Sequence, residues 1–522
     1  MSDTEDEVED DEEDDEGDEE ELERFEALCA SFRRNDPETT EVPRFYLTNA
    51  YGRRLGEALQ GNQHVSYMCI NLDHLLDGNE EGTDSIALLL RYFRESEAMR
   101  KVELWGNAGR LTAEAGKTII LAIAENPCIE DLNMSINVEH VLEEFAFFLR
   151  RTQSLKTLRI TLDGEATSSQ TRELLAEAFG ANQTLETLTL QNGSNTDLVE
   201  SVLRRLGSHP CLRELQLICL TNVRVADIHA LASLLRSTTL LVHLKLRSYI
   251  FNKEQMEVLV EGLHSNQSLT KLSVSGCSFN LEASDVFRCF VQTCETRSSI
   301  RELSFDGTFG LGAQFTGVLL GYWLILLDEN QGAGSSIASS LQILDLGSNL
   351  AGFFLALEDN ASRILLPCLH CRDHMGRADW DALNRCLPKL VYLKELYIAG
   401  LEGGDVSSRG FLDALRKNGS LQHVVITQAN FFNEAEACLV QSYCKRNEAI
   451  PSLVAKVQLD KDGDDDETDI LLFPTIFQLA KQATRTAPNS ILVGLLAAGD
   501  AIGPCRQCDK RSRPDEMVER FS

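Results

Sequence analysis

Two glycine-containing stretches have residue types that bind phosphate groups in other proteins. AGKT at 115–118 has the glycine, lysine and threonine of a phosphate-binding loop, but Leu111 stands where that motif needs its first glycine. GLG at 310–312 lacks the third glycine of a dinucleotide-binding fingerprint. Since those glycines let backbone amides close around a phosphate, we predict no nucleotide site and no cofactor.

A third stretch, DKDGDDDETD at 460–469, has the carboxylates of a calcium loop. A loop of the EF-hand kind that begins at Asp460 needs glycine at its sixth position for a sharp turn, and Asp465 is there instead. We therefore interpret 459–469 as a solvated acidic loop.

Cysteine pairs occur as CLHC at 368–371, with His374 close behind, and as CRQC at 505–508. Structural zinc takes four converging ligands, so a lone pair of cysteines two residues apart is a weak signal. We favour structural thiols, with zinc at Cys368 and Cys371 as the minor alternative.

Residues for nucleophilic or hydrolytic chemistry form no recognisable set. The chain contains neither GxSxG nor HExxH, and its ten histidines are scattered. We therefore expect a non-enzymatic protein without catalytic or metal-binding residues.

The dominant pattern of the chain is an internal repeat of the form apolar-x-x-apolar-x-apolar. Clear copies are LKTLRI at 155–160 and LETLTL at 185–190, and most copies follow the previous one by 26 to 31 residues. VPRFYL at 42–47 is an imperfect first copy. The other copies begin at Val65, Met99, Ile129, Leu155, Leu185, Leu212, Leu241, Leu269, Ile300, Leu341, Leu393 and Leu421.

Each repeat has two halves with different periodicity. The motif ends in an apolar-polar alternation, which predicts a short strand, and the following segment has helical spacing, as in Val199, Val202, Leu203 and Leu206. A strand followed by a helix that returns to a parallel strand is one turn of a right-handed βα solenoid. The predicted fold class is therefore α/β.

Asparagine recurs three residues before the start of the strand motif. Because asparagine tolerates the left-handed conformation that ends helices, we predict that it ends the helix there. It stands at Asn62, Asn126, Asn182, Asn266 and Asn418.

With a period near 28, the motif resembles the ribonuclease-inhibitor type of leucine-rich repeat, and residues 102–121 (VELWGNAGRLTAEAGKTIIL) resemble it closely. Three copies carry asparagine or cysteine after the strand, at Asn107, Cys277 and Asn349. The resemblance covers 42–446 and implies a horseshoe-shaped solenoid. It implies no particular function, because the fold serves inhibitors, sensors, actin regulators and GTPase regulators. YCKRNEAIP, FPTIFQLA and PNSILVGLLAAGD resemble C-terminal segments of predicted diatom leucine-rich repeat proteins of unassigned activity.

These patterns divide the chain into five parts. We predict a disordered acidic tail at 1–23, a cap with the first imperfect repeat at 24–64, and a solenoid of about 12 repeats at 65–446. The two long spacings predict insertions near 328–340 and 350–390, the latter a looped-out segment or a degenerate repeat. A helical C-terminal cap at 447–502, which includes the acidic loop, and a disordered tail at 503–522 complete the chain.

Charge and cysteine usage restrict the partners and the compartment. The formal net charge is −32, and residues 3–23 hold 17 acidic side chains, which leaves about −15 on the body. An acidic body disfavours nucleic acid and anionic membranes. The acidic N-terminus is unlike a secretory signal, and we interpret the 15 cysteines as reduced thiols. We expect a monomer in the cytoplasm or nucleus.

The residues between the buried apolar positions of each strand predict a concave binding surface. Trp105 is an aromatic at the seventh position of its motif copy, where small residues are typical. Arg159 lies at the fifth position of its own copy. A basic patch, whose members we expect to converge on two adjacent strands, consists of His243, Lys245, Arg247 and Lys271.

We interpret the chain as a scaffold that binds a protein ligand on its concave strand face. We hypothesise that the acidic tail folds back onto the basic patch and gates binding.

One alternative is a regulator of a small GTPase, by likeness to the GTPase-activating protein of the Ran cycle, whose acidic tail follows its repeats instead of preceding them. Another is a chaperone of histones or other basic proteins, by likeness in composition to acidic leucine-rich nuclear phosphoproteins.

Overall fold

The computed structural model describes most of the first 460 residues of the chain. The described residues are 15–46, 49–71, 80–106, 113–135, 141–162, 168–192, 197–219, 223–279, 299–305, 341–346, 353–358, 361–401, 408–427 and 432–460. They fall into two units, Met1–Leu269 and Thr270–Ser522. GLG at 310–312, the predicted insertion at 328–340, and the segments 470–500 and 503–522 lie outside the described residues.

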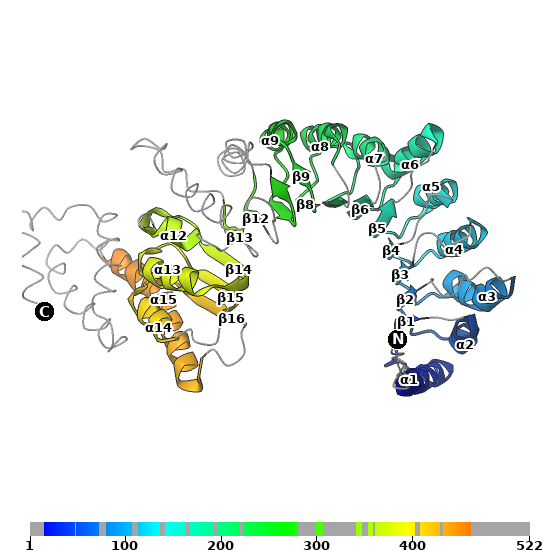
Figure 1. The fold of residues 1–522 in the computed structure, drawn as a ribbon, viewed down its shortest axis with the longest axis horizontal. Coiled ribbons are helices and arrows are strands. Elements are labelled where there is room, and N and C mark those ends of the chain that lie inside the picture. The colour runs from blue at the N-terminus through cyan, green and yellow to red at the C-terminus, as the bar shows by residue number, and fades with distance from the viewer. Residues whose placement is uncertain are drawn as a thin grey trace, which may run out of the picture. The chain divides into compact units, whose positions relative to one another are not determined.

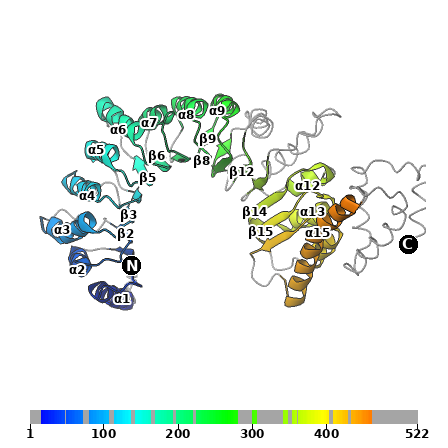
Figure 2. The ribbon, with the colours of Figure 1, turned by 180° about the vertical axis from the view of Figure 1, so that it is seen from behind.

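The first unit alternates strands and helices along the chain. Its elements are α1 Asp15–Arg33, β1 Glu41–Tyr46, α2 Asn49–Leu59, β2 Tyr67–Asn71, α3 Glu80–Glu95, β3 Lys101–Trp105, α4 Ala113–Glu125, β4 Asp131–Ser135, α5 Leu142–Arg151, β5 Thr157–Leu162, α6 Ser169–Ala181, β6 Thr187–Asn192, α7 Leu198–Leu206, β7 Glu214–Cys219, α8 Val225–Ser237, β8 His243–Arg247, β9 Ile250–Phe251 and α9 Lys253–Ser265. Strands β1 to β8 pair in parallel in chain order. In this unit the helices lie on the outside of an arc and the strands on its inside (Figure 1), and the view from behind shows the same two layers (Figure 2).

The second unit continues the alternation. Its elements are β10 Lys271–Ser275, β11 Ser278–Phe279, β12 Glu302–Ser304, β13 Ile343–Asp345, α12 Phe353–Leu357, a 3-10 turn Ala361–Arg363, β14 Cys368–Met375, α13 Arg377–Cys386, a 3-10 turn Leu387–Lys389, β15 Glu395–Leu401, α14 Ser408–Lys417, β16 His423–Ile426 and α15 Glu434–Asp460. Strands β10, β12, β13, β14, β15 and β16 pair in parallel in that order. Both units therefore have the predicted βα architecture.

The repeating leucines form the core between strands and helices. Leu188 and Leu190 of β6 and Leu203 of α7 are 0 to 1% exposed. Each such side chain contributes roughly 2 kcal/mol when it is removed from water. The strand alternation thus directs every second side chain toward the helices and leaves the others on the opposite face.

The recurring asparagines join each repeat to the one before it. Asn182 is 1% exposed, and its Nδ2 donates to the carbonyl oxygen of Leu149 in the preceding repeat at 2.7 Å. Its Oδ1 accepts from the backbone N–H groups of Thr184 and Leu185 at 3.0 and 2.8 Å. Asn62, Asn126, Asn266 and Asn418 have the same two-way bonding.

The predicted left-handed conformation of these asparagines is wrong. Asn182 has φ −65° and ψ 138°, and Asn266 has φ −83° and ψ 137°, both in the extended region. Asparagine occurs there because it has a donor and an acceptor on one short side chain. The donor reaches the previous repeat while the acceptor satisfies the turn into the strand.

One predicted insertion is a complete repeat. Strand β14 lies inside the segment 350–390 and pairs with β13 and β15. Leu366, Leu369 and Cys371 are buried, so LxxLxC at 366–371 is the strand motif with cysteine in its last apolar position. The motif at 366–371 therefore divides the long spacing between the copies on either side of it into two spacings of ordinary repeat length.

The two ends differ from the predicted boundaries. Helix α1 begins at Asp15, so residues 15–23 of the predicted disordered tail are helical, and residues 1–14 lie outside the described residues. Helix α15 crosses the predicted start of the C-terminal cap and ends at Asp460, the second residue of the predicted acidic loop. The predicted boundary of the acidic tail and that of the C-terminal cap therefore each fall inside a long helix.

Helix α15 closes the end of α14 through a buried arginine. Arg446 is 8% exposed, and its guanidinium donates to the carbonyl oxygens of Arg416 at 2.9 Å and Asn418 at 2.5 Å. These carbonyls lie at the C-terminal end of α14, where the helix itself supplies no donor.

We expect Arg446→Met to lower the free energy of unfolding by about 3 kcal/mol, because it leaves buried carbonyl oxygens without donors. Urea unfolding would measure the loss, and hydrogen exchange would localise it to α14. Lys445→Met, at the exposed neighbouring position, is the matched control and should change little. Equal effects of the two substitutions would contradict the capping role.

Candidate interaction surface

The strand face that points away from the helices of the first unit is called the inner face here. The strand register places Lys101 beside Tyr67 and Asp131, and Trp105 beside Asn71. Because side chains alternate along a strand, the first, third and fifth residues of β2 to β8 lie on this face, whereas the register of β1 is irregular after Val42. The predicted site residues Trp105 and Arg159 therefore share one surface.

Trp105 is oriented by its neighbours. Its indole N–H donates to Glu103 Oε2 at 3.3 Å, while Glu103 Oε1 lies 2.7 Å from the ammonium of Lys101. This ammonium also lies 4.7 Å from the centre of the Tyr67 ring, and its hydrogen bond to Glu103 raises the pKa of Lys101. Both carboxylate oxygens of Glu103 are thus engaged, so the half-buried indole is held in one orientation before any partner arrives.

The middle of the inner face is polar and largely uncharged. Arg159 on β5 is half-buried, next to Asn133 in the register. Burial raises the pKa of Asp131, and the charges of Lys101 and Arg159 oppose this. Most of the remaining side chains are hydroxyls and amides, namely Thr157, Thr161, Thr187, Thr189, Gln191 and Gln216, and the apolar Ile218 of β7 is in register with Arg247.

The predicted basic patch is largely compensated by carboxylates. On β8, Lys245 Nζ lies 2.6 Å from Glu214 Oε1, and His243 Nδ1 lies 3.6 Å from Glu214 Oε2. The hydrogen bond from His243 and that from Lys245 lower the pKa of Glu214 to about 2. Arg247 is exposed and forms no ion pair with any described residue. Sequence reasoning missed Glu214 because it lies about 30 residues from its partners along the chain.

Lys271 belongs to the second unit, on β10. Its ammonium lies 2.7 Å from Glu302 Oε2 on the neighbouring strand β12. The structure therefore brings together His243, Lys245 and Arg247 on β8, and it places Lys271 in a separate ion pair.

The second unit has an aromatic and thiol cluster on the corresponding strand face. Cys368 Sγ lies 3.2 Å from His370 Nε2 and 3.7 Å from Glu395 Oε2. The His370 and Tyr397 rings meet edge to face at 4.7 Å. Burial, aided by Glu395, raises the pKa of Cys368 to about 12, and burial lowers the pKa of His370. A protonated thiol beside a neutral imidazole is a poor nucleophile.

The alternation of β14 separates the two cysteines of CLHC. Cys368 shares the outward face with His370, whereas Cys371 is 0% exposed and occupies the core, where burial raises its pKa. The pair therefore does not converge on one metal position. In the described part of the chain, no group of three or more histidine, cysteine or acidic side chains is arranged to hold a metal ion.

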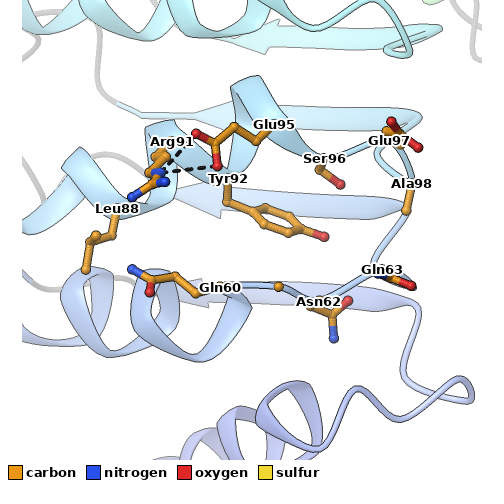
Figure 3. Close-up of a pocket in the computed structure, with 11 residues that line it drawn as sticks. Gln60, Asn62, Gln63, Leu88, Arg91, Tyr92, Glu95, Ser96, Glu97 and Ala98 are labelled. Carbon is orange, nitrogen blue, oxygen red and sulfur yellow. Dashed lines mark hydrogen bonds and ion pairs between the residues drawn. The ribbon is translucent and has the colours of Figure 1, made fainter.

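A cleft of about 900 Å³ lies between α2 and α3 (Figure 3). Its lining comes from helices and turns, and several of its polar groups bind one another or the backbone. Arg91 Nε donates to both oxygens of Glu95 at 2.9 and 3.1 Å, and the Tyr92 hydroxyl donates to the Val65 carbonyl at 3.2 Å. These contacts support the repeat stack, so we assign the cleft no ligand.

AGKT at 115–118 lies inside α4, where Lys117 pairs with Glu144 at 3.1 Å. A helical backbone directs its amides along its own axis, so this segment forms no phosphate cradle. Across the described residues, no helix combines the length and the apolar character that crossing a membrane requires.

The fold and the repeated motif define a leucine-rich-repeat solenoid. The sequence matches no family model and no curated protein. Among solved structures, the yeast Rad7 and Elc1 complex is similar at 15% identity and a TM-score of 0.37, over 78% of this chain and 94% of that chain.

Two other solved structures are similar over shorter lengths of this chain. A tropomodulin C-terminal domain from Caenorhabditis elegans has 14% identity and a TM-score of 0.23, over 30% of this chain and 92% of that chain. A protein from Bacteroides fragilis has 10% identity and a TM-score of 0.30, over 56% of this chain and 84% of that chain.

Proposed function

We propose that this chain is a non-enzymatic scaffold that binds a protein ligand on the inner face of its first unit. The observation that carries the proposal is Trp105, an aromatic held by Glu103 within a largely polar strand surface. Aromatic side chains that are already ordered lose little entropy on binding and dominate the energy of many interfaces. The repeat type we assign is that of ribonuclease inhibitor, and the compartment is the cytoplasm or nucleus.

Trp105→Ala should lower the affinity for the protein ligand at least roughly tenfold, because truncating a central aromatic anchor commonly costs 2 kcal/mol or more. Proximity labelling in the native cell, with the full-length chain and the variant, would identify the ligand, and titration would then measure the affinity. Phe147→Ala is the matched control, since Phe147 is an exposed aromatic on the helix α5. Equal labelling and equal affinity for both variants would refute the proposal.

Gating by the acidic tail has a weaker physical basis than the sequence implies. Lys245 and Lys271 already pair with carboxylates, which leaves Arg247 as the main target for acidic residues. Removal of residues 1–14, which leaves α1 intact, should therefore change ligand affinity by less than about twofold, as expected for weak exposed pairs. A large rise in affinity after this deletion would restore the gating hypothesis.

A further inference from the structure

The inner face of the first unit is graded in charge from β1 to β8. Among the side chains that the structure describes on the first four strands, this face carries the carboxylates of Glu41, Glu103 and Asp131 and the ammonium of Lys101. Strands β7 and β8 carry Glu214 against His243, Lys245 and Arg247. Between them lie the hydroxyls and amides of β5 to β7, with Arg159 at the border of the acidic end.

We propose that this face binds an extended protein segment that crosses the strands, with a cationic side chain at β3 and β4 and a carboxylate at β8. The side chains between them are uncharged and polar. This inference rests on the proposed function and specifies the chemistry of the ligand. From β3 to β8 there are five steps of about 4.8 Å, roughly 24 Å, which an extended segment of about seven residues spans.

The acidic end already shows how it holds a cation. The Lys101 ammonium lies 4.7 Å from the Tyr67 ring centre and 2.7 Å from Glu103, so an aromatic face and a carboxylate together bind it. Asp131 lies on the other side of Lys101 in the register, half-buried, and burial disfavours its charged form. A cationic side chain of the ligand beside Asp131 and Trp105 would stabilise the charged form of Asp131 and so offset the effect of its burial.

At the other end, Arg247 supplies the complementary charge. It is exposed at the end of β8, and its forked guanidinium suits a carboxylate. Lys245 is tied to Glu214, which limits the positive charge there to a small area. This spacing of opposite charges disfavours a polyanion such as a nucleic acid, whose phosphates would meet Glu103 and Asp131 at the far end.

The middle of the face selects against charge, because its side chains apart from Arg159 and the apolar Ile218 are neutral hydrogen-bonding groups. Thr189 Oγ1 lies 3.5 Å from Gln216 Oε1, at the limit of a hydrogen bond, so both retain bonding capacity. Hydroxyls and amides donate and accept, and they therefore match serine, threonine, asparagine or glutamine side chains of a ligand. A charged side chain would lose its hydration there without gaining a counter-ion.

Selection from a library of random 12-residue peptides against the full-length chain tests the proposal. We expect enriched peptides to carry Lys or Arg and Asp or Glu separated by about five to seven positions. Arg247→Glu should weaken these peptides at least about tenfold, as loss and reversal of a charge pair do. Repeated selection against that variant should replace the acidic position with Lys or Arg. Glu103→Gln, which keeps the shape, should weaken binding of the cationic end several-fold.

The matched control is Arg236→Glu on α8, whose side chain pairs with Glu261 of α9 among the helices, and it should leave peptide binding unchanged. Peptides that depend on Trp105 but show no ordered charges would overturn this inference and leave the proposed function standing. Enriched peptides that are insensitive to Trp105→Ala would count against both. Enrichment of a nucleic acid instead of peptides, in a parallel selection, would also overturn it.

Discussion

Asn182→Ala is expected to lower the free energy of unfolding of the first unit by about 3 to 5 kcal/mol, the sum for three buried polar groups that lose a partner. The substitution removes the donor to the Leu149 carbonyl and the acceptor for the Thr184 and Leu185 amides. Asn182 is 1% exposed, so water does not replace these bonds without opening the turn. Urea unfolding followed by circular dichroism measures the change.

Two further measurements separate this role from a general loss of packing. Hydrogen exchange should show the largest loss of protection at the amides of Thr184 and Leu185. Asn182→Asp retains the acceptor but loses the donor and buries a charge, so it should be no less damaging than alanine. Gln183→Ala, at the exposed next position, is the control. If Asn182→Ala proved as mild as this control, the asparagine would not join the repeats.

A second effect on stability, which is largest at low pH, is expected at His209, which stands in the asparagine position of its repeat. Its Nδ1 accepts from the Leu212 amide at 3.0 Å, but its buried Nε2 has no hydrogen-bond partner. Burial lowers the pKa of His209 to about 4. His209→Asn should supply the missing donor to the preceding repeat, at the Phe179 carbonyl that corresponds to Leu149, and stabilise the fold by about 1 kcal/mol at pH 7.

The gain should grow as the pH falls, because the unfolded chain protonates histidine near pH 6.5 whereas the folded chain resists protonation until about pH 4. Between these values the unfolded state binds more protons, so the wild-type free energy of unfolding falls by about 2 kcal/mol from pH 7 to pH 5. The asparagine variant lacks this loss. Urea unfolding of both proteins at pH 7 and pH 5 tests it, and a pH-independent difference would show that His209 does not titrate in this way.

Much of the fold follows from local sequence periodicity. The motif LETLTL became β6 with Leu188 and Leu190 buried, and the stripe of Val199, Val202 and Leu203 became the core face of α7. Periods of two and of about 3.6 residues are consequences of backbone geometry, so a single repeat predicts its own strand and helix.

The sequence left open whether 350–390 is a looped-out segment or a degenerate repeat, because one residue of the strand motif at β14 departs from the pattern. Cys371 fills the last apolar position, and cysteine is small and apolar enough to pack in a core. The pairing of Cys368 with Cys371 at metal-ligand spacing concealed this role. Counting cysteine as apolar would have found LxxLxC at 366–371 and two ordinary spacings in place of one long one.

For the candidate site, sequence position predicted which residues share the inner face but not what they contact. Trp105, Arg159 and Lys245 all lie on it, as strand alternation requires. Glu103 and Glu214, which engage Trp105 and Lys245, received no role, although Glu103 is only two residues from Trp105. The role of Glu103 could have been recognised from the sequence, because it lies two residues before Trp105 and therefore on the same strand face.

The amino-acid sequence by itself determined the repeat length, the alternation of strand and helix and the buried leucines, because these depend on spacings within one repeat. Only the tertiary structure decided that Glu214 compensates His243 and Lys245, and that Asn182 bonds to Leu149. Both contacts join residues about 30 positions apart, and they exist only once neighbouring strands stand in one particular register. Small shifts of that register would exchange the partners without changing the repeat pattern.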